Sequence, residues 1–116
     1  MPAARLDVPI TEAVSADFRA GVMSWRQALG QERKSIATIR AYLTTVRQLA
    51  DFLLARGMPT APENITAEHA REYLLAQANP ATARLRYFAL RQFFAYLVRD
   101  GELRKSPLDT VRAMSS

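Results

Sequence analysis

The chain has 116 residues, of which 49% are hydrophobic, which is enough for one domain with a single core and too little for two. It has no cysteine and only one histidine, which excludes disulfides, thiol catalysis and a zinc site built from cysteine and histidine. Sixteen Lys and Arg against eleven Asp and Glu give a net charge of +5, and this balance favours a polyanionic partner.

The N-terminal residues and the length of the apolar runs indicate the cellular compartment of the protein. The first residues, MPAARLDVPITEAV, lack the apolar core of a signal peptide. No later apolar run approaches the roughly 18 residues that are needed to span a bilayer. We therefore expect a soluble, cytoplasmic protein with no membrane partner, and the absence of cysteine fits a reducing compartment.

Four segments carry apolar residues at the spacing of an amphipathic helix, and none shows the sustained alternation of a strand. The first predicted helix covers residues 15–29, with Ser15 as its N-cap and Gly30 as its stop. The second predicted helix follows Ser35 and runs to about Arg56.

The remaining two helices follow a segment with two prolines, which must leave the helical conformation. Thr66 can cap a third helix that runs to about Ala78. Asn79 and Pro80 form a favourable N-cap and first residue for a fourth helix, which ends at about Arg99. Four helices with short connections predict an all-α fold, a compact bundle.

The fourth predicted helix has a buried side and a basic side. Its apolar side is expected to hold Ala83, Tyr87, Leu90, Phe93, Phe94 and Leu97. Another face holds Arg84, Phe88, Arg91 and Ala95, so that two arginines stand two turns apart. Arg86 lies closer to the apolar side, where we expect it to snorkel or to pair with an acid from a neighbouring helix.

The second predicted helix shows a comparable basic flank, because Arg40, Thr44 and Arg47 follow one another at i, i+4 and i+7. Guanidinium groups match phosphate oxygens and guanine edges. Any single arginine more commonly lies on a solvated helix face than at a DNA contact. Two such flanks in a basic protein favour nucleic acid.

The positive charge is concentrated in two segments. Residues 33–56 hold five basic groups and one acidic group, and residues 80–105 hold six basic groups and two acidic groups, a net +4 in each. Residues 63–72 hold three acidic groups and one basic group, a net −2. The two basic segments are those that contain the second and the fourth predicted helices.

Three stretches, SIATIRAYLTTVRQLADFLLARG, ENITAEHAREYLLA and ATARLRYFALRQFFAYLVRDGELRKSP, follow one another along the chain. Their order and spacing resemble the N-terminal core-binding domain of tyrosine recombinases, also called the phage-integrase SAM-like domain. The positions that carry the resemblance are Ser35, Thr38, Tyr42, Ile65, Thr66, Arg84, Leu90, Arg91, Phe93 and Pro107.

The resemblance implies a SAM-like bundle of four main helices over residues 12–112. Residues 1–11 would then be an N-terminal extension, and residues 113–116 a tail or the start of a linker to an absent catalytic domain. In this family the domain forms half of a clamp on duplex DNA, and two of its helices cross the major groove. Those helices correspond to the second and fourth predicted helices here.

The family's catalytic residues are not expected in this chain. Recombinases of this type use a tyrosine nucleophile in a separate C-terminal domain, with two arginines, a lysine and a His-x-x-Arg motif. Here His69 is followed by Ala70, Arg71 and Glu72, which does not match that motif. We therefore expect no enzymatic activity. An excised recombinase domain and a natural short protein both remain open, and the tail KSPLDTVRAMSS, which resembles a lead into a catalytic domain, favours the first.

The leading hypothesis is that the chain is a DNA-binding module in DNA integration or recombination. We expect the protein to be of bacterial or phage origin and associated with the nucleoid. The implied partners are double-stranded DNA, the catalytic domain of the same recombinase and further recombinase subunits assembled on DNA. No metal or cofactor is expected. The predicted DNA-binding residues are Lys34, Ser35, Thr38, Arg40, Thr44, Arg47, Thr82, Arg84 and Arg91.

Two other classes of function stay open. A helical protein-interaction module would use exposed apolar residues such as Met23, Phe88 and Met114, and its binding would depend weakly on salt. A small enzyme could use Glu68 and Glu72, four residues apart, for acid-base catalysis, although an acidic solvated face is the commoner meaning of such a pair.

Overall fold

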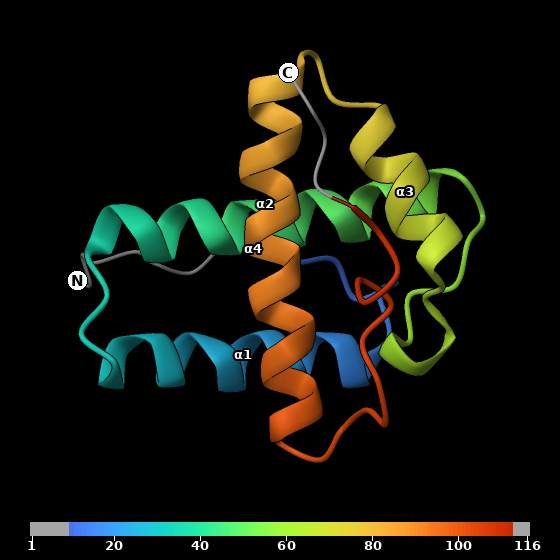
Figure 1. Cartoon of the computed structure of the whole chain (residues 1–116). Coiled ribbons are helices and arrows are strands. Elements are labelled where there is room, and N and C mark those ends of the chain that lie inside the picture. Colours follow the sequence, from blue (N-terminus) through green and yellow to red (C-terminus); the bar gives the residue numbers. More distant parts are fainter. Residues whose placement is uncertain (1–9, 113–116) are drawn as a thin grey trace.

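Four α-helices and one 3-10 turn make up the structure, a computed structural model that describes residues 10–112 (Figure 1). The elements are α1 (Ala16–Gln31), α2 (Ile36–Ala55), the 3-10 turn η1 (Pro62–Asn64), α3 (Ala67–Leu75) and α4 (Pro80–Arg99). These described residues contain no strand, so the predicted all-α bundle is confirmed. Met114, the expected tail over 113–116 and most of the expected extension over 1–11 lie outside the described range.

Side-chain caps fix the starts of three helices. Ser15, Ser35 and Asn79 each accept a hydrogen bond from a backbone N–H in the first turn of α1, α2 and α4, at 3.2, 3.1 and 2.9 Å respectively. A cap of this kind typically contributes about 1 kcal/mol to stability. The predicted starts of these three helices are therefore confirmed, together with the interactions that set them.

The end of α1 differs from the prediction. The expected stop at Gly30 is wrong, because the helix continues to Gln31 and Arg33 takes the left-handed backbone conformation, with a φ of 62°. The N–H of Lys34 then reaches back to the carbonyl of Leu29 at 3.2 Å and closes the helix end. A residue with a Cβ usually costs about 1–2 kcal/mol in this conformation, so the sequence gives no reason to expect it at an arginine.

The end of α3 also differs, because the helix stops at Leu75 rather than at the predicted Ala78. The side-chain amide of Gln77 donates to the carbonyl of Tyr73 at 2.8 Å. In a continuing helix that carbonyl would accept from the backbone N–H of Gln77. That N–H bonds to the carbonyl of Leu74 instead, at 3.2 Å, so the glutamine side chain replaces the helical donor and ends the helix.

Aromatic rings from α1 and α4 form the centre of the core. The ring of Phe93 lies 5.5 Å from that of Phe18, 5.2 Å from that of Trp25 and 5.1 Å from that of Phe94, measured between centroids. Trp25 also stacks on Tyr42 of α2 at 5.4 Å. The predicted buried side of α4 is confirmed, since Ala83, Tyr87, Leu90, Phe93, Phe94 and Leu97 are all buried, and Ala89 is buried in addition.

The helices are arranged so that α4 crosses the other two long helices. α1 and α2 run antiparallel beside each other, α4 crosses both, and α3 lies near the C-terminal end of α2 (Figure 1). A Cβ atom placed on Gly21 of α1 would stand 3.0 Å from Cδ2 of Leu97 on α4. The missing side chain at Gly21 therefore lets α4 approach α1 closely at this crossing.

The core also includes residues outside the helices. Val14 precedes α1 and is buried, and Leu108 and Val111 follow α4 and are buried as well. The segment after α4 passes beside η1 and the start of α3, and Leu103 within it is largely buried. Short segments on both sides of the four helices thus complete the packing.

Tyr73 gives α3 a titratable anchor on α2. Its ring packs edge-on against Phe52 at 5.5 Å, and its hydroxyl donates to the side-chain oxygen of Gln48 at 3.4 Å. Burial raises the pKa of Tyr73 to about 12, against an opposing effect of the Arg86 charge. The folded protein therefore keeps this phenol protonated at a pH where the unfolded chain has lost the proton.

We expect this difference to lower the free energy of unfolding as pH rises from about 10 to about 12. Two pKa units correspond to about 2–3 kcal/mol, and below about pH 10 the tyrosine adds no pH dependence. Urea unfolding between about pH 8 and 12 measures the loss. Tyr73→Phe should remove it while other titrating groups remain, so equal alkaline losses in both proteins would contradict this account.

Candidate nucleic-acid interface

Three of the predicted contact residues lie on one flank of α2, here called the α2 flank: Arg40, Thr44 and Arg47. Arg40 is exposed, and Thr44 and Arg47 are half-buried. The Nε of Arg47 is buried and has no hydrogen-bond partner within residues 10–112. A partly desolvated guanidinium without a partner is stabilised by an anion that approaches it.

The N-terminal end of α2 holds three further predicted residues, which are Lys34, Ser35 and Thr38. Lys34 and Ser35 are exposed and Thr38 is half-buried. The Ser35 hydroxyl accepts from the Thr38 N–H and donates to the Thr38 hydroxyl at 3.0 Å. The two hydroxyls are therefore engaged in capping the helix, and Lys34 supplies the charge at this end.

The second basic set lies on the outer side of α4 and is here called the α4 stripe: Arg84 and Arg91, with Phe88 between them. All three side chains are exposed, as the sequence predicts. One terminal nitrogen of Arg91 donates to the hydroxyl of Tyr87 at 3.0 Å. The buried Tyr87 ring thus orients a guanidinium at the surface, and its remaining N–H groups stay available for a ligand.

Thr82 does not join the α4 stripe. It precedes Arg84 by two residues, and two residues correspond to about 200° around a helix. Its backbone N–H donates to the Asn79 side chain, so it belongs to the cap of α4. The structure therefore separates this predicted contact residue from the two arginines with which the sequence groups it.

Arg86, the remaining arginine in the first half of α4, links the two basic helices. Its terminal nitrogen donates to the hydroxyl of Thr45 on α2 at 3.0 Å. Thr45 is buried, and its hydroxyl in turn donates to the carbonyl of Ala41 at 3.0 Å. The expected pairing of Arg86 with an acid therefore needs correction, because the partner is a neutral hydroxyl, and the alternative that its head group snorkels stays a prediction.

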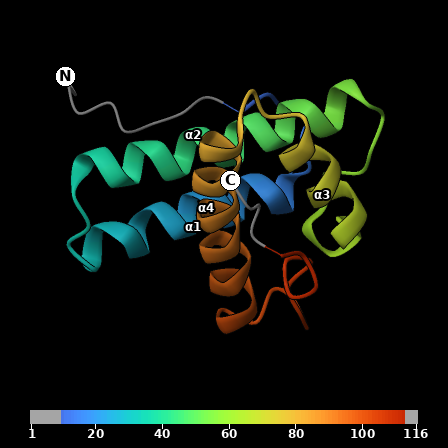
Figure 2. The same ribbon diagram turned by 45° about the horizontal axis from the view of Figure 1, so that its top comes forward.

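This bond also shows how the two basic sets are oriented. Thr45 and Arg86 mark the sides on which α2 and α4 face each other. Arg47 follows Thr45 by two residues and Arg84 precedes Arg86 by two, so each arginine points away from that contact. Neither Arg47 nor Arg84 therefore lies at the contact between the two helices. The N-terminal end of α4 extends past α2 on the side away from α1 in Figure 1, and Figure 2 shows the crossing of α4 over α1 and α2 from another angle.

The acidic residues of α3 are paired with arginines outside the two basic sets. Glu68 accepts from Arg71 at 2.8 Å, and Glu72 lies 3.8 Å from Arg56. His69, the only histidine, is half-buried, and its Nδ1 accepts from the N–H of Thr66 at 3.0 Å to complete the cap of α3. These contacts give the acidic pair and the histidine structural roles.

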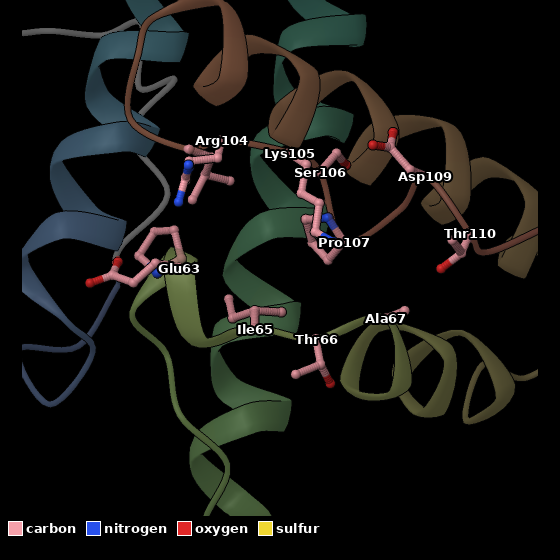
Figure 3. A pocket seen from close by; sticks show the side chains of 12 residues that line it. Glu63, Ile65, Thr66, Ala67, Arg104, Lys105, Ser106, Pro107, Asp109 and Thr110 are labelled. Atoms are coloured by element: carbon pink, nitrogen blue, oxygen red, sulfur yellow. The ribbon is translucent and has the colours of Figure 1, made fainter.

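A groove of about 470 Å³ lies between the start of α3 and the segment after α4 (Figure 3). Ile65 and Leu103 contribute apolar surface to it. Its charged residues are of both signs, because Arg104, Lys105 and Asp109 come from the segment after α4 and Glu63 comes from η1 (Figure 3), so it adds no uniform field for an anion. Within residues 10–112, no group of three His, Cys, Asp or Glu side chains could hold a metal ion.

No helix in the described part of the chain is long and apolar enough to cross a bilayer.

The fold and the sequence assign the chain to one class. A four-helix, all-α bundle with no strand in residues 10–112 is consistent with the SAM-like type. The family model described as the phage integrase, N-terminal SAM-like domain matches residues 22–107, so the chain belongs to this family. The match is to this N-terminal domain and not to a catalytic domain. Comparisons with curated proteins and with solved structures give no match.

Proposed function

We propose that this domain is the DNA-binding module of a tyrosine recombinase or integrase and that it grips duplex DNA through the α2 flank and the α4 stripe. The observation that carries the proposal is that three of the arginines of these two sets, Arg40, Arg47 and Arg91, lie at or near the surface without a carboxylate partner in the described residues. Within residues 10–112, Arg40, Arg47 and Arg91 make no ion pair. Their charge remains available to an external anion.

The chemistry of the two sets suits phosphates better than a protein carboxylate. Each set repeats an arginine over two helical turns, and duplex DNA offers regularly spaced negative charge on both walls of its grooves. Because the two sets lie on different helices, each would contact its own part of the duplex. Arg91 is held in place by Tyr87, so less side-chain freedom is lost when it binds.

The remaining partners follow from the family. Strand exchange would be carried out by a catalytic domain of the same recombinase, and other recombinase subunits would meet this domain on the DNA. This chain would then supply affinity and position while another domain supplies the chemistry. Such a protein would work on nucleoid DNA in a bacterial or phage-derived setting.

A helical protein-interaction module is the second candidate. It is supported by Met23 on α1 and Leu75 on α3, which are 69% and 62% exposed. Apolar packing on a partner would use these helices and would survive high salt. Phosphate binding by the basic helices would weaken steeply as the salt concentration rises.

Binding of the chain to a duplex of about 30 base pairs, measured between about 50 and 200 mM salt, tests the proposal. If Arg40, Arg47, Arg84 and Arg91 each contact one phosphate, the logarithm of the affinity should fall linearly with the logarithm of the salt concentration, with a slope of about −3.6. Absence of DNA binding, or an affinity that does not change with salt, would reject the proposal and favour the protein-interaction module.

A further inference from the structure

Two large apolar side chains lie on the exposed side of α4 beside the arginines. Leu85 is 72% exposed and Phe88 is 47% exposed. They are three residues apart and therefore adjacent on the helix surface. Phe88 also sits between Arg84 and Arg91, four residues after the first and three before the second. This part of α4 thus presents an apolar patch, Leu85 and Phe88, bordered by positive charge.

The position of the patch is set by the fold. The ring of Phe88 packs edge-on against the ring of Tyr87, with centroids 5.3 Å apart. Tyr87 is buried and accepts the hydrogen bond from Arg91. One buried residue therefore orients both the aromatic ring and one of the arginines beside it, and a ligand would meet a preorganised surface.

The spacing of the charges indicates what the patch can face. Arg84 and Arg91 are seven residues apart, which places their Cα atoms about 10.5 Å apart along the helix axis. The major groove of B-DNA is about 12 Å wide, and phosphates line both of its walls. Arginines at this separation can reach the two walls while the side chains between them stand over the base edges. The apolar group at the floor of that groove is the C5 methyl of thymine.

We propose that Leu85 and Phe88 contact thymine methyl groups in the major groove, so that α4 reads A·T pairs as well as phosphates. This inference rests on the proposed DNA-binding function and deepens it, because it assigns base discrimination to two residues that the sequence-based contact set does not include. A second copy of the chain fits the patch less well, because Arg84, Arg91 and Arg99 would bring like charges together across such an interface.

The test compares an alternating A·T duplex of about 30 base pairs with the same duplex carrying deoxyuridine in place of thymidine, which removes only the methyl groups. Burial of one methyl group corresponds to about a fourfold gain in affinity. We expect the wild-type chain to prefer the thymidine duplex by about fourfold to fifteenfold, for one or two methyl contacts. The double variant Leu85→Ala/Phe88→Ala should bind both duplexes equally and keep the wild-type salt slope.

Met23→Ala is the matched control, because it removes an exposed apolar side chain of similar size from a different helix. It should leave the preference for thymidine unchanged. If the wild-type chain binds the two duplexes with equal, salt-sensitive affinity, the inference is overturned and the proposed function stays intact. A preference that persists in the double variant would assign methyl recognition to another surface and also overturn it. If the wild-type chain binds neither duplex at any salt concentration, the DNA-binding proposal and this inference are rejected together.

Discussion

Replacing Phe93 by alanine should lower the free energy of unfolding by about 3–5 kcal/mol. The side chain is 0% exposed, and the rings of Phe18, Trp25 and Phe94 surround it at 5.1–5.5 Å. Truncation would remove its buried apolar surface and leave a cavity that three rigid rings cannot fill. For a domain of this size the total stability is about 6–17 kcal/mol, so the loss is a large share of it.

Urea unfolding followed by circular dichroism measures this loss. Gln92→Ala is the control, because it changes the neighbouring residue on the exposed side of the same helix and should cost less than about 0.5 kcal/mol. A decrease in the free energy of unfolding below about 1 kcal/mol for Phe93→Ala would mean that Phe93 of α4 does not lie at the centre of the core.

The second large effect is expected on DNA binding. The triple variant Arg40→Gln/Arg84→Gln/Arg91→Gln removes arginines from both basic sets while it keeps side chains of high helix propensity. Three lost phosphate contacts should reduce the magnitude of the salt slope by about 2.7 and weaken binding near 0.1 M salt by more than about a hundredfold. Titration of a labelled duplex at several salt concentrations measures both quantities.

A charge-matched variant separates contact from overall attraction. Arg56→Gln/Arg71→Gln/Arg112→Gln lowers the net charge by the same three units but leaves both basic sets intact. Two of its arginines lie beside Glu72 and Glu68, so their charge is already compensated locally. Its salt slope should stay close to that of the wild type. Equal weakening by the two triple variants would mean that binding depends on net charge and not on the α2 flank and the α4 stripe.

Most of the fold is predictable because its signals are local. The caps at Ser15, Ser35 and Asn79 start three helices at the expected residues. The apolar spacing of α4 identifies its buried side, since burial follows the helical period directly. The helix ends are less predictable, because they depend on Arg33 and Gln77 taking roles that other residue types usually take.

The arrangement of the candidate site could not be predicted in the same way. Helical periodicity identifies Arg40 and Arg84 as members of basic faces, but it does not predict the angle at which two helices cross. That angle is fixed by contacts such as the bond between Arg86 and Thr45, which are 41 residues apart in the sequence. It sets how the two arginine sets lie relative to each other, and no pattern within one helix encodes this.

The buried residues before position 22 and after position 107 define how short a fragment of this domain can be. The family match covers residues 22–107, whereas the side chains that seal the core extend from Val14 to Val111. A fragment trimmed to the matched region would lose Phe18, which touches Phe93, and would also lose Leu108. Apolar surface at both ends of the bundle would then be open to water, and such a fragment would tend to aggregate through the faces that these residues normally cover.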